Sequence, residues 1–264
     1  MQFFDHEKKQ IIYVKKAASK EYWDELWGGK FDLEKIVPSP LTSWVVQQTK
    51  KHITAGRVLE AGCGRSQNVY SLHRAGYDVV GVDFAPKVVS YVKKHSPNLD
   101  VRHADVRKLP FADEAFDVYW SIGVIEHFIE GYDKIITEMD RVLTQGGYAF
   151  ITFPAMNRLR RLKARLGKYP EVSKATKEQL DNFYQFALEP NDVITILKNH
   201  SYSIVEKFYF DGTKGIKDEI PLLGSMLQVI YDGKKGWRYI KKAIDYTCSR
   251  HAGHCICLIA KKHK

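Results

Sequence analysis

Short apolar runs alternate with segments of helical periodicity along residues 57–153. Apolar runs of about four to eight residues that are bounded by turn-forming residues are typical of buried strands. Such runs occupy residues 57–61, 77–83, 99–105, 116–123 and 148–153. Between them, residues 87–95 and 135–142 place apolar side chains at helical spacing. Strands that alternate with helices form βαβ units, so the pattern predicts an α/β fold with a doubly wound, mostly parallel sheet.

The segment before this core is predicted to be helical. We expect residues 1–55 to form an N-terminal cap, in which Trp23 and Trp27 lie one turn apart on one helix face. These two rings either pack on the core or close over a site, and the two roles are compatible. A break at Pro38-Ser39-Pro40 precedes a further helix over about residues 41–51.

Two more strands are predicted after the core, at residues 203–210 and 254–260. The sequence therefore predicts one domain over residues 1–264, with its core at 56–153. Residues 154–190 and 211–250 are predicted to be helical insertions that cover a substrate site. The second insertion contains a basic segment at residues 234–242.

A basic helix is predicted at the start of the first insertion. Arg158, Arg161 and Arg165 fall on one helical face, which Arg160 and Lys163 broaden. A neighbouring face carries Leu159, Leu162 and Leu166. Such a helix is commonly a solvated surface element. Alternatively, its arginines bind a phosphate or carboxylate of a ligand, or an anionic membrane surface.

Composition adds few constraints. A chain of 264 residues with 44% hydrophobic content is long enough to bury a full core. The N-terminus lacks an apolar core of signal-peptide length and no run approaches the ~20 residues that span a bilayer, so we expect a cytoplasmic protein. The four cysteines show no disulfide framework. Cys255 and Cys257 supply two thiolates where structural zinc takes four ligands, so no metal site is predicted. The net charge of +10 favours an anionic partner.

A glycine-containing loop follows the first strand of the core. Gly62 and Gly64 lack a Cβ atom, so the backbone can turn tightly and a ligand can lie against bare peptide groups. The next helix offers free N–H groups at its start. Asp83 ends the following strand about twenty residues on, where a carboxylate meets the ribose in a βαβ nucleoside site. The two strand ends therefore predict a pocket for an adenosine-like ligand.

The residues around this loop favour a cationic ligand over a pyrophosphate. A dinucleotide site would have a third glycine where Gln67 stands. Glu60 directly precedes the loop and places a negative charge beside it. That charge would repel a pyrophosphate, whereas it would hold an ammonium or sulfonium group.

The segment from Glu60 to Ser66, with the strand-end acids Asp83 and Asp105, resembles the first motifs of the class I S-adenosylmethionine-dependent methyltransferases. Their first motif reads acid-x-Gly-x-Gly-x-Gly, and Ser66 replaces its last glycine. Residues 116–128 resemble the small-molecule (methyltransferase type 11-like) branch of this superfamily. The resemblance implies a Rossmann-like seven-stranded sheet whose last strand is antiparallel and lies between the fifth and sixth. It also implies S-adenosyl-L-methionine as cofactor and S-adenosyl-L-homocysteine as product.

The resemblance further implies a cofactor site. Its residues are Glu60, Gly62, Cys63, Gly64, Asp83, Phe84, Asp105, Val106, Ser121 and Ile122. Glu60 and the glycine backbone would hold the methionine end of the cofactor, and Asp83 would bind the ribose hydroxyls. Phe84 would lie beside the adenine.

The remaining positions of this site have further implied roles. Asp105 would bind the adenine amino group, although a turn or helix-cap role is the alternative for this residue. Val106 would supply a backbone contact. Ser121 and Ile122 would line the wall near the methyl group.

His127 is the candidate catalytic residue. It belongs to a Glu126-His127 pair after the fourth strand, which borders the substrate cavity in the branch that the chain resembles. An unperturbed histidine pKa of about 6.5 suits proton acceptance at neutral pH. A purely structural histidine is the alternative, because many methyl acceptors need no base.

Three functions are compatible with these features. The leading one is in-line methyl transfer to a small-molecule, lipid or sugar acceptor, with an anionic acceptor or peripheral membrane contact favoured only by the positive charge. An RNA methyltransferase has the same support from charge, but the Asn/Asp-Pro-Pro-aromatic motif of many nucleic-acid amino methyltransferases is absent after the fourth strand. A non-catalytic cofactor-binding protein is the third.

Overall fold

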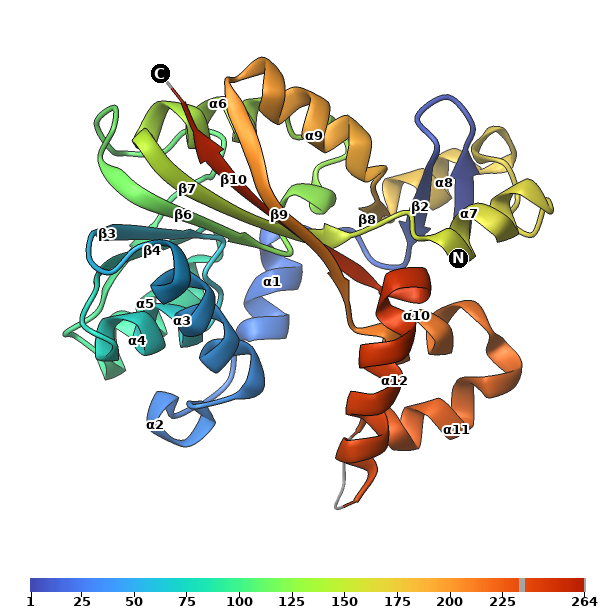
Figure 1. Ribbon diagram of the computed structural model, residues 1–264, viewed down its shortest axis with the longest axis horizontal. Coiled ribbons are helices and arrows are strands. Elements are labelled where there is room, and N and C mark those ends of the chain that lie inside the picture. The colour runs from blue at the N-terminus through green and yellow to red at the C-terminus, as the bar shows by residue number, and fades with distance from the viewer. Residues whose placement is uncertain (233–235, 264) are drawn as a thin grey trace.

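The computed structural model describes residues 1–232 and 236–263 and contains a seven-stranded sheet in the order β5-β4-β3-β6-β7-β10-β9 (Figure 1). Its strands are β3 Arg57–Ala61, β4 Asp78–Asp83, β5 Asp100–His103, β6 Phe116–Ile122, β7 Leu143–Pro154, β9 Tyr202–Phe210 and β10 Cys255–Lys262. The first five pair in parallel, and β10 runs antiparallel to both β7 and β9. This confirms the doubly wound topology and the place of the antiparallel strand that the sequence predicts.

Helices cover both faces of this sheet because its inner strands are apolar on both sides. On β3, Val58 packs into one buried cluster and Leu59 into another. The same division separates Val118 from Tyr119 on β6. One cluster includes α3 Pro40–His52, α4 Gln67–Arg74 and α5 Pro86–His95, and the other includes α6 Asp133–Val142 and α9 Pro190–Asn199. In a parallel sheet that is covered on both faces, each strand is a continuous apolar run, and such runs identify these strands in the sequence.

The first fourteen residues form strands, so the prediction of a fully helical N-terminal cap is wrong there. β1 Gln2–Asp5 and β2 Gln10–Val14 make a hairpin, and β8 Phe183–Ala187 extends it to a small antiparallel sheet. Neighbouring residues of this hairpin, Phe3 and Phe4, pack into different buried clusters. Both faces are thus covered, which removes the apolar–polar alternation that would identify the strands. The first insertion, which supplies β8, is therefore not entirely helical.

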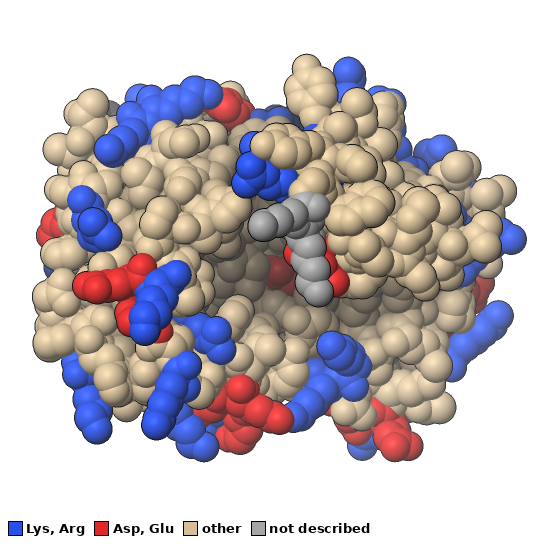
Figure 2. Space-filling model, turned by 90° about the horizontal axis from the view of Figure 1, so that it is seen from below, with Lys and Arg blue, Asp and Glu red and all other residues tan. Residues whose placement is uncertain are grey.

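The remaining helical elements include two groups that lie apart from each other. They are α1 Lys20–Trp27, α2 Leu33–Ile36, η1 Ile125–His127, α7 Arg158–Arg165, η2 Val172–Lys174, α8 Lys177–Asp181, α10 Gly212–Glu219, α11 Pro221–Tyr231 and α12 Trp237–Ala252. Figure 1 shows α1 and α2 on one side and α10–α12 on the other. From below, the surface is hollowed between the two groups (Figure 2). Among the described residues, no helix has the length and apolar character that crossing a bilayer requires.

The basic helix α7 is present, but its faces differ from the prediction. Arg160, which was expected to widen the basic face, is fully buried and donates from Nε to Glu219 Oε1 at 2.9 Å. By contrast, Leu162 and Leu166 are 53% and 62% exposed. A buried ion pair therefore anchors α7 to α10, while two of the three leucines on the neighbouring face are exposed to solvent. Of the predicted basic segment 234–242, Lys234 and Lys235 lie outside the described residues.

Candidate functional site

The glycine loop between β3 and α4 needs both glycines for a specific reason. Gly62 has φ +83° and Gly64 has φ +48°, in the left-handed region that favours glycine. A Cβ atom on Gly62 would lie 2.4 Å from Val124 Cγ2. The Gly62 and Cys63 amides donate to the Val82 carbonyl oxygen at 2.8 and 2.9 Å, which joins the loop to the end of β4. Bare backbone is therefore held beside the strand that carries Asp83.

Asp83 is fixed at the end of β4 by backbone donors. Its Oδ2 accepts from the Gly64 amide at 2.8 Å, and its Oδ1 accepts from the Ala85 amide at 2.9 Å. Burial raises the pKa of this carboxyl above its usual value, while the two amides oppose the shift. The side chain borders a cavity of about 250 Å³. An acid fixed in this way can accept hydrogen bonds from ligand hydroxyls without having to reorganise.

Asp105 also lines this cavity and forms an ion pair with its neighbour Arg107. Arg107 donates from Nη2 to Asp105 Oδ2 at 2.7 Å and from Nε to Asp105 Oδ1 at 3.0 Å. The Arg107 backbone amide also donates to Oδ1, at 2.8 Å, so the turn role considered for Asp105 is real. Hydrogen bonding to Arg107 lowers the pKa of Asp105. Its place in the cavity lining keeps the predicted adenine contact open as well.

Glu60 does not carry the negative charge that the sequence predicts beside the loop. Its side chain is buried, and Asn68 Nδ2 donates to its Oε1 at 2.7 Å. Burial raises the pKa of Glu60 to about 8, so the carboxyl is mainly neutral at pH 7. It becomes an anion when the pH rises above this value or when a cation is brought close to it.

The cavity brings together most, but not all, of the predicted cofactor residues. Those in its lining are Gly62, Asp83, Phe84, Asp105, Val106 and Ile122. Glu60, Cys63, Gly64 and Ser121 are not in the lining. Cys63 and Ser121 are buried, and burial holds the pKa of the Cys63 thiol well above its usual value. The predicted roles of these four residues remain predictions.

The tryptophans of α1 form the outer wall of the cavity. Trp23 and Trp27 stack at 6.1 Å between ring centroids, and both line the cavity. The Trp27 ring lies over Gly64, 3.3 Å from where a Cβ atom would be. Arg65 ties the helix end to the glycine loop, since its Nε donates to the Trp27 carbonyl oxygen at 2.9 Å. The rings thus pack on the glycine loop and line the cavity, and their closing over a bound ligand stays a prediction.

His127 borders the cavity as a neutral imidazole. Its Nδ1 lies 2.7 Å from the Tyr184 carbonyl oxygen, which can only accept, so Nδ1 carries the proton and Nε2 the free lone pair. Burial lowers the pKa of His127 to about 4. Burial also raises the pKa of its neighbour Glu126 to about 8, so that carboxyl is mainly protonated at pH 7. His127 can thus accept a proton or a hydrogen bond at Nε2, although as a weak base.

Several lining residues were not singled out from the sequence. They include Ala18, Arg107, Gly123, Val124, Phe128 and Glu130. Most lie in loops after β5 and β6, where no periodic pattern exists to mark them. Within residues 1–232 and 236–263, no three or more His, Cys, Asp or Glu side chains gather as metal ligands would.

Comparison with known proteins gives the class to which this site belongs. Residues 59–151 match the family model of a methyltransferase domain. A probable S-adenosylmethionine-dependent methyltransferase from Mycolicibacterium smegmatis is 35% identical over 111 residues, which cover 42% of this chain and 43% of that protein. A phthiotriol/phenolphthiotriol dimycocerosates methyltransferase from Mycobacterium ulcerans is 32% identical over 108 residues, 39% of this chain and 40% of that protein. The chain thus spans about two fifths of the length of these relatives.

A solved structure supports the fold along nearly the whole chain. Geranyl diphosphate C-methyltransferase from Streptomyces coelicolor, crystallised with geranyl diphosphate and S-adenosyl-L-homocysteine, superposes with a TM-score of 0.55. The alignment covers 93% of this chain and 99% of that chain, at 12% identity. This likeness concerns the fold alone.

The fold and the strand-end cavity define an α/β protein with a cavity at its glycine loop. Through residues 59–151, the chain is similar to the class I S-adenosylmethionine-dependent methyltransferase superfamily. S-adenosyl-L-methionine is the cofactor of that superfamily, which confirms the cofactor predicted from the sequence.

Proposed function

We propose that this protein transfers a methyl group from S-adenosyl-L-methionine to a small-molecule, lipid or sugar acceptor. The observation that carries the proposal is the juxtaposition of bare glycine backbone at Gly62, the backbone-held carboxylate of Asp83 and the aromatic wall of α1 around one cavity. The names of the similar proteins support methyl transfer. The finer choice of acceptor rests on residues 116–128 and on the insertions.

The described residues fit the cofactor. Asp83 offers fixed acceptors for ribose hydroxyls, and Asp105, ionised by Arg107, offers an acceptor for an amino group. The buried carboxyl of Glu60 offers a counter-ion for a cationic methionine end. When bound, the cofactor supplies a methyl group that its sulfonium already activates for displacement.

The chain's own residues then position the reactants and exclude water. Trp23 and Trp27 close the cavity, which removes solvent from the reacting groups. Holding two reactants in line lowers the barrier through orientation alone. For an acceptor that must lose a proton, Nε2 of His127 would be the atom that takes it. The Tyr184 carbonyl keeps the ring in the tautomer that leaves Nε2 unprotonated. We assign His127 this role for acceptors with an ionisable proton.

Incubation with methyl-tritiated cofactor tests the proposal. The protein would be supplied separately with an organic-soluble extract, a water-soluble small-molecule extract and total RNA. We expect label in one of the first two and none in the RNA, and we expect Asp83→Ala to abolish the transfer. Label in RNA, with binding that weakens steeply with salt, would favour the RNA alternative. Cofactor binding without labelling of any fraction would favour the non-catalytic alternative.

A further inference from the structure

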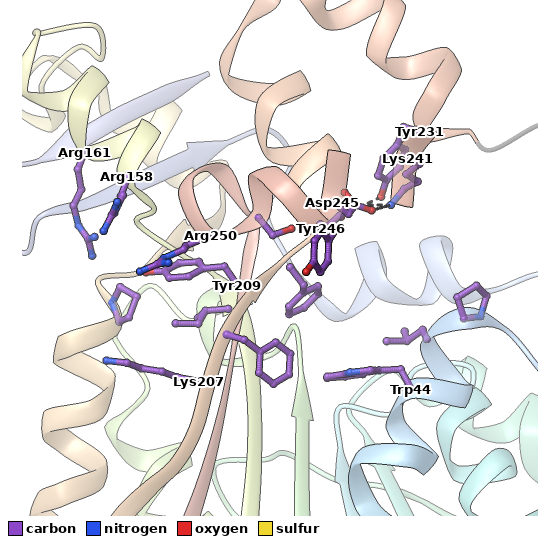
Figure 3. Close-up of a pocket in the computed structure, with 18 of the residues that line it drawn as sticks. Trp44, Arg158, Arg161, Lys207, Tyr209, Tyr231, Lys241, Asp245, Tyr246 and Arg250 are labelled. Carbon is purple, nitrogen blue, oxygen red and sulfur yellow. Dashed lines mark hydrogen bonds and ion pairs between the residues drawn. The ribbon is translucent and has the colours of Figure 1, made fainter. Parts of the chain in front are cut away.

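A second and larger cavity lies at the same edge of the main sheet. It is a groove of about 1410 Å³, lined by residues of α3, α7, α9, β9 and α12 (Figure 3). Phe208, Tyr209 and Phe210, which line it, lie at the carboxyl-terminal end of β9. The carboxyl-terminal ends of β3, β4 and β6 carry the smaller cavity. Ligands of open α/β sheets bind at this edge.

One end of the groove is cationic. Arg158 and Arg161 come from α7, Lys207 from β9 and Arg250 from α12, and Figure 3 shows them on the same side of the groove, around Tyr209. Arg161 is held by Glu189, with Nη2 2.7 Å from Oε1. Among the described residues, no carboxylate lies within ion-pair distance of the other three cations. Arg158 donates instead to His251 Nδ1 at 3.3 Å, so its charge is not neutralised.

The opposite side of the groove is aromatic and apolar. Trp44 packs against Phe208 and Phe210, with ring centroids 6.0 and 5.9 Å apart. At the rim, Leu41 is 43% exposed and Tyr246 is 91% exposed. Figure 3 places Trp44 away from the arginines. An apolar molecule could therefore lie along this wall and gain from covering it.

The other charged part of the lining is a cluster of groups that pair with one another. Lys241 Nζ lies 2.7 Å from Asp245 Oδ2 and 3.4 Å from Asp211 Oδ1. Asp245 Oδ1 also accepts from the Thr213 amide at 2.8 Å. Because these groups include one cation and two carboxylates, they offer an anionic head group no free cation. Within the described part of the chain, the groove thus has unpaired cations at one end and an apolar wall on the opposite side.

We propose that this groove binds an amphipathic anion, a molecule with a phosphate or carboxylate head and an apolar body. The head would lie among Arg158, Lys207 and Arg250, and the body along Trp44, Phe208 and Phe210. The inference deepens the proposed function, because such a molecule is the class of methyl acceptor that this edge of the sheet would admit. Arginine favours planar, bidentate anions, which fits either head group.

Calorimetric titration with dodecyl phosphate, below its micelle concentration, tests the groove directly. Dodecanoate, inorganic phosphate, dodecyl maltoside and a short RNA oligonucleotide serve as comparison ligands. The test variant is Arg158→Gln/Arg250→Gln, and the matched control is Arg165→Gln, an exposed arginine of the same helix that is not in the groove lining. A second variant, Leu41→Asp, changes the exposed apolar rim without touching the cations.

We expect dodecyl phosphate or dodecanoate to bind at one site, and the stronger of the two identifies the head group. The double variant should weaken that binding by at least about tenfold, because charge-assisted hydrogen bonds are lost. Leu41→Asp should weaken it as well, whereas Arg165→Gln should not. Inorganic phosphate and dodecyl maltoside should bind much more weakly, since each has only half of the recognised chemistry.

Three results would overturn the proposal. They are absence of binding by both dodecyl anions, equal affinity in the double variant and the wild type, and preferential binding of RNA. Titration of the same samples with S-adenosyl-L-homocysteine separates this outcome from failure of the proposed function. If the groove proposal fails alone, the nucleoside still binds and the labelling assay still gives a methylated product; if the proposed function fails, that labelling is lost.

Discussion

Gly62 is the residue whose substitution distinguishes a ligand-cradling glycine from an ordinary turn glycine. Gly62→Ala would place a Cβ atom 2.4 Å from Val124 Cγ2 at φ +83°. Gly76 has φ +93° but nothing within 4 Å of its would-be Cβ atom, so Gly76→Ala is the matched control. We expect the control to lose about 1–2 kcal/mol of stability from backbone strain alone. Gly62→Ala should lose more and should also lose S-adenosyl-L-homocysteine affinity by calorimetry. Equal effects of the two substitutions would contradict the role of Gly62.

The raised pKa of Glu60 leads us to expect that cofactor binding depends on pH. Its pKa of about 8 in the free protein should fall when a cationic ligand arrives, so binding releases a proton. Affinity should therefore rise with pH, by at most about tenfold per unit, and level off near pH 8. Calorimetry with S-adenosyl-L-homocysteine, in buffers of different ionisation enthalpy, measures the proton release. Glu60→Gln should remove this component, and an unchanged pH profile in the variant would exclude Glu60.

The same raised pKa has a consequence for stability. A group with a folded-state pKa above its unfolded value stabilises the fold fully below the unfolded pKa, and this contribution is lost as pH rises through the folded pKa. For Glu60 the loss falls between about pH 4.5 and pH 8. Glu60→Gln should thus weaken the pH dependence of unfolding in urea, while the fold is retained.

The sequence could identify Gly62, Asp83 and Asp105 because their roles depend on local spacing after strands. It could not give the protonation of Glu60, which depends on burial by elements far along the chain. The buried ion pair of Arg160 could not be predicted for the same reason. Nothing in the local pattern of α7 distinguishes the arginine that pairs with Glu219 from its exposed neighbours, since Glu219 lies 59 residues away.

At the scale of single elements, α1 is expected to control access to the cofactor cavity. At about 250 Å³ the cavity is smaller than the ~300–1,000 Å³ usual for ligand sites, and Trp27 lies on the glycine loop. We therefore expect α1 to move outward on binding. Trp27→Ala should raise both the association and dissociation rates of S-adenosyl-L-homocysteine several-fold in stopped-flow experiments. Leu26→Ala, at an exposed position of the same helix, is the control. Unaltered rates in Trp27→Ala would show that α1 is not a gate.

The anchoring of α7 gives a second prediction at this scale. Arg160 and Glu219 are both fully buried, and Lys163 and Tyr169 also contact Glu219. Arg160→Met removes one partner of a buried pair, which should cost about 3–5 kcal/mol in urea unfolding. Arg161→Met breaks the partly exposed pair with Glu189 and should cost no more than about 1 kcal/mol. Similar costs for the two variants would contradict the anchoring role of Arg160.

The elements of the core could be predicted because buried parallel strands and amphipathic helices have clear periods. The hairpin at β1 and β2 could not, since Phe3 and Phe4 are buried on opposite faces. Its partner β8 lies far along the chain, in an insertion without a clear pattern. This small sheet nevertheless matters for the site, because β8 supplies the Tyr184 carbonyl that orients His127.

At the scale of the whole molecule, we propose that the two cavities divide the function between them. The smaller lies at the strand ends that carry the glycine loop, and the larger lies at the end of β9, beside the insertions. The sequence indicated that the insertions cover a substrate site, but it could not show which of their cations remain free. Arg160 and Lys163 pair with Glu219, whereas Arg158 and Arg250 face the groove. Contact with a membrane surface remains a prediction from charge.

The central claim is that an S-adenosyl nucleoside, rather than a dinucleotide, occupies the glycine-loop cavity. Calorimetric titration of the purified protein with S-adenosyl-L-homocysteine and, in parallel, with NADH tests it most directly. We expect one S-adenosyl-L-homocysteine per chain, weakened by at least about tenfold in Asp83→Ala, and no measurable binding of NADH. Binding of NADH, or no binding of S-adenosyl-L-homocysteine to the wild-type protein, would contradict the account.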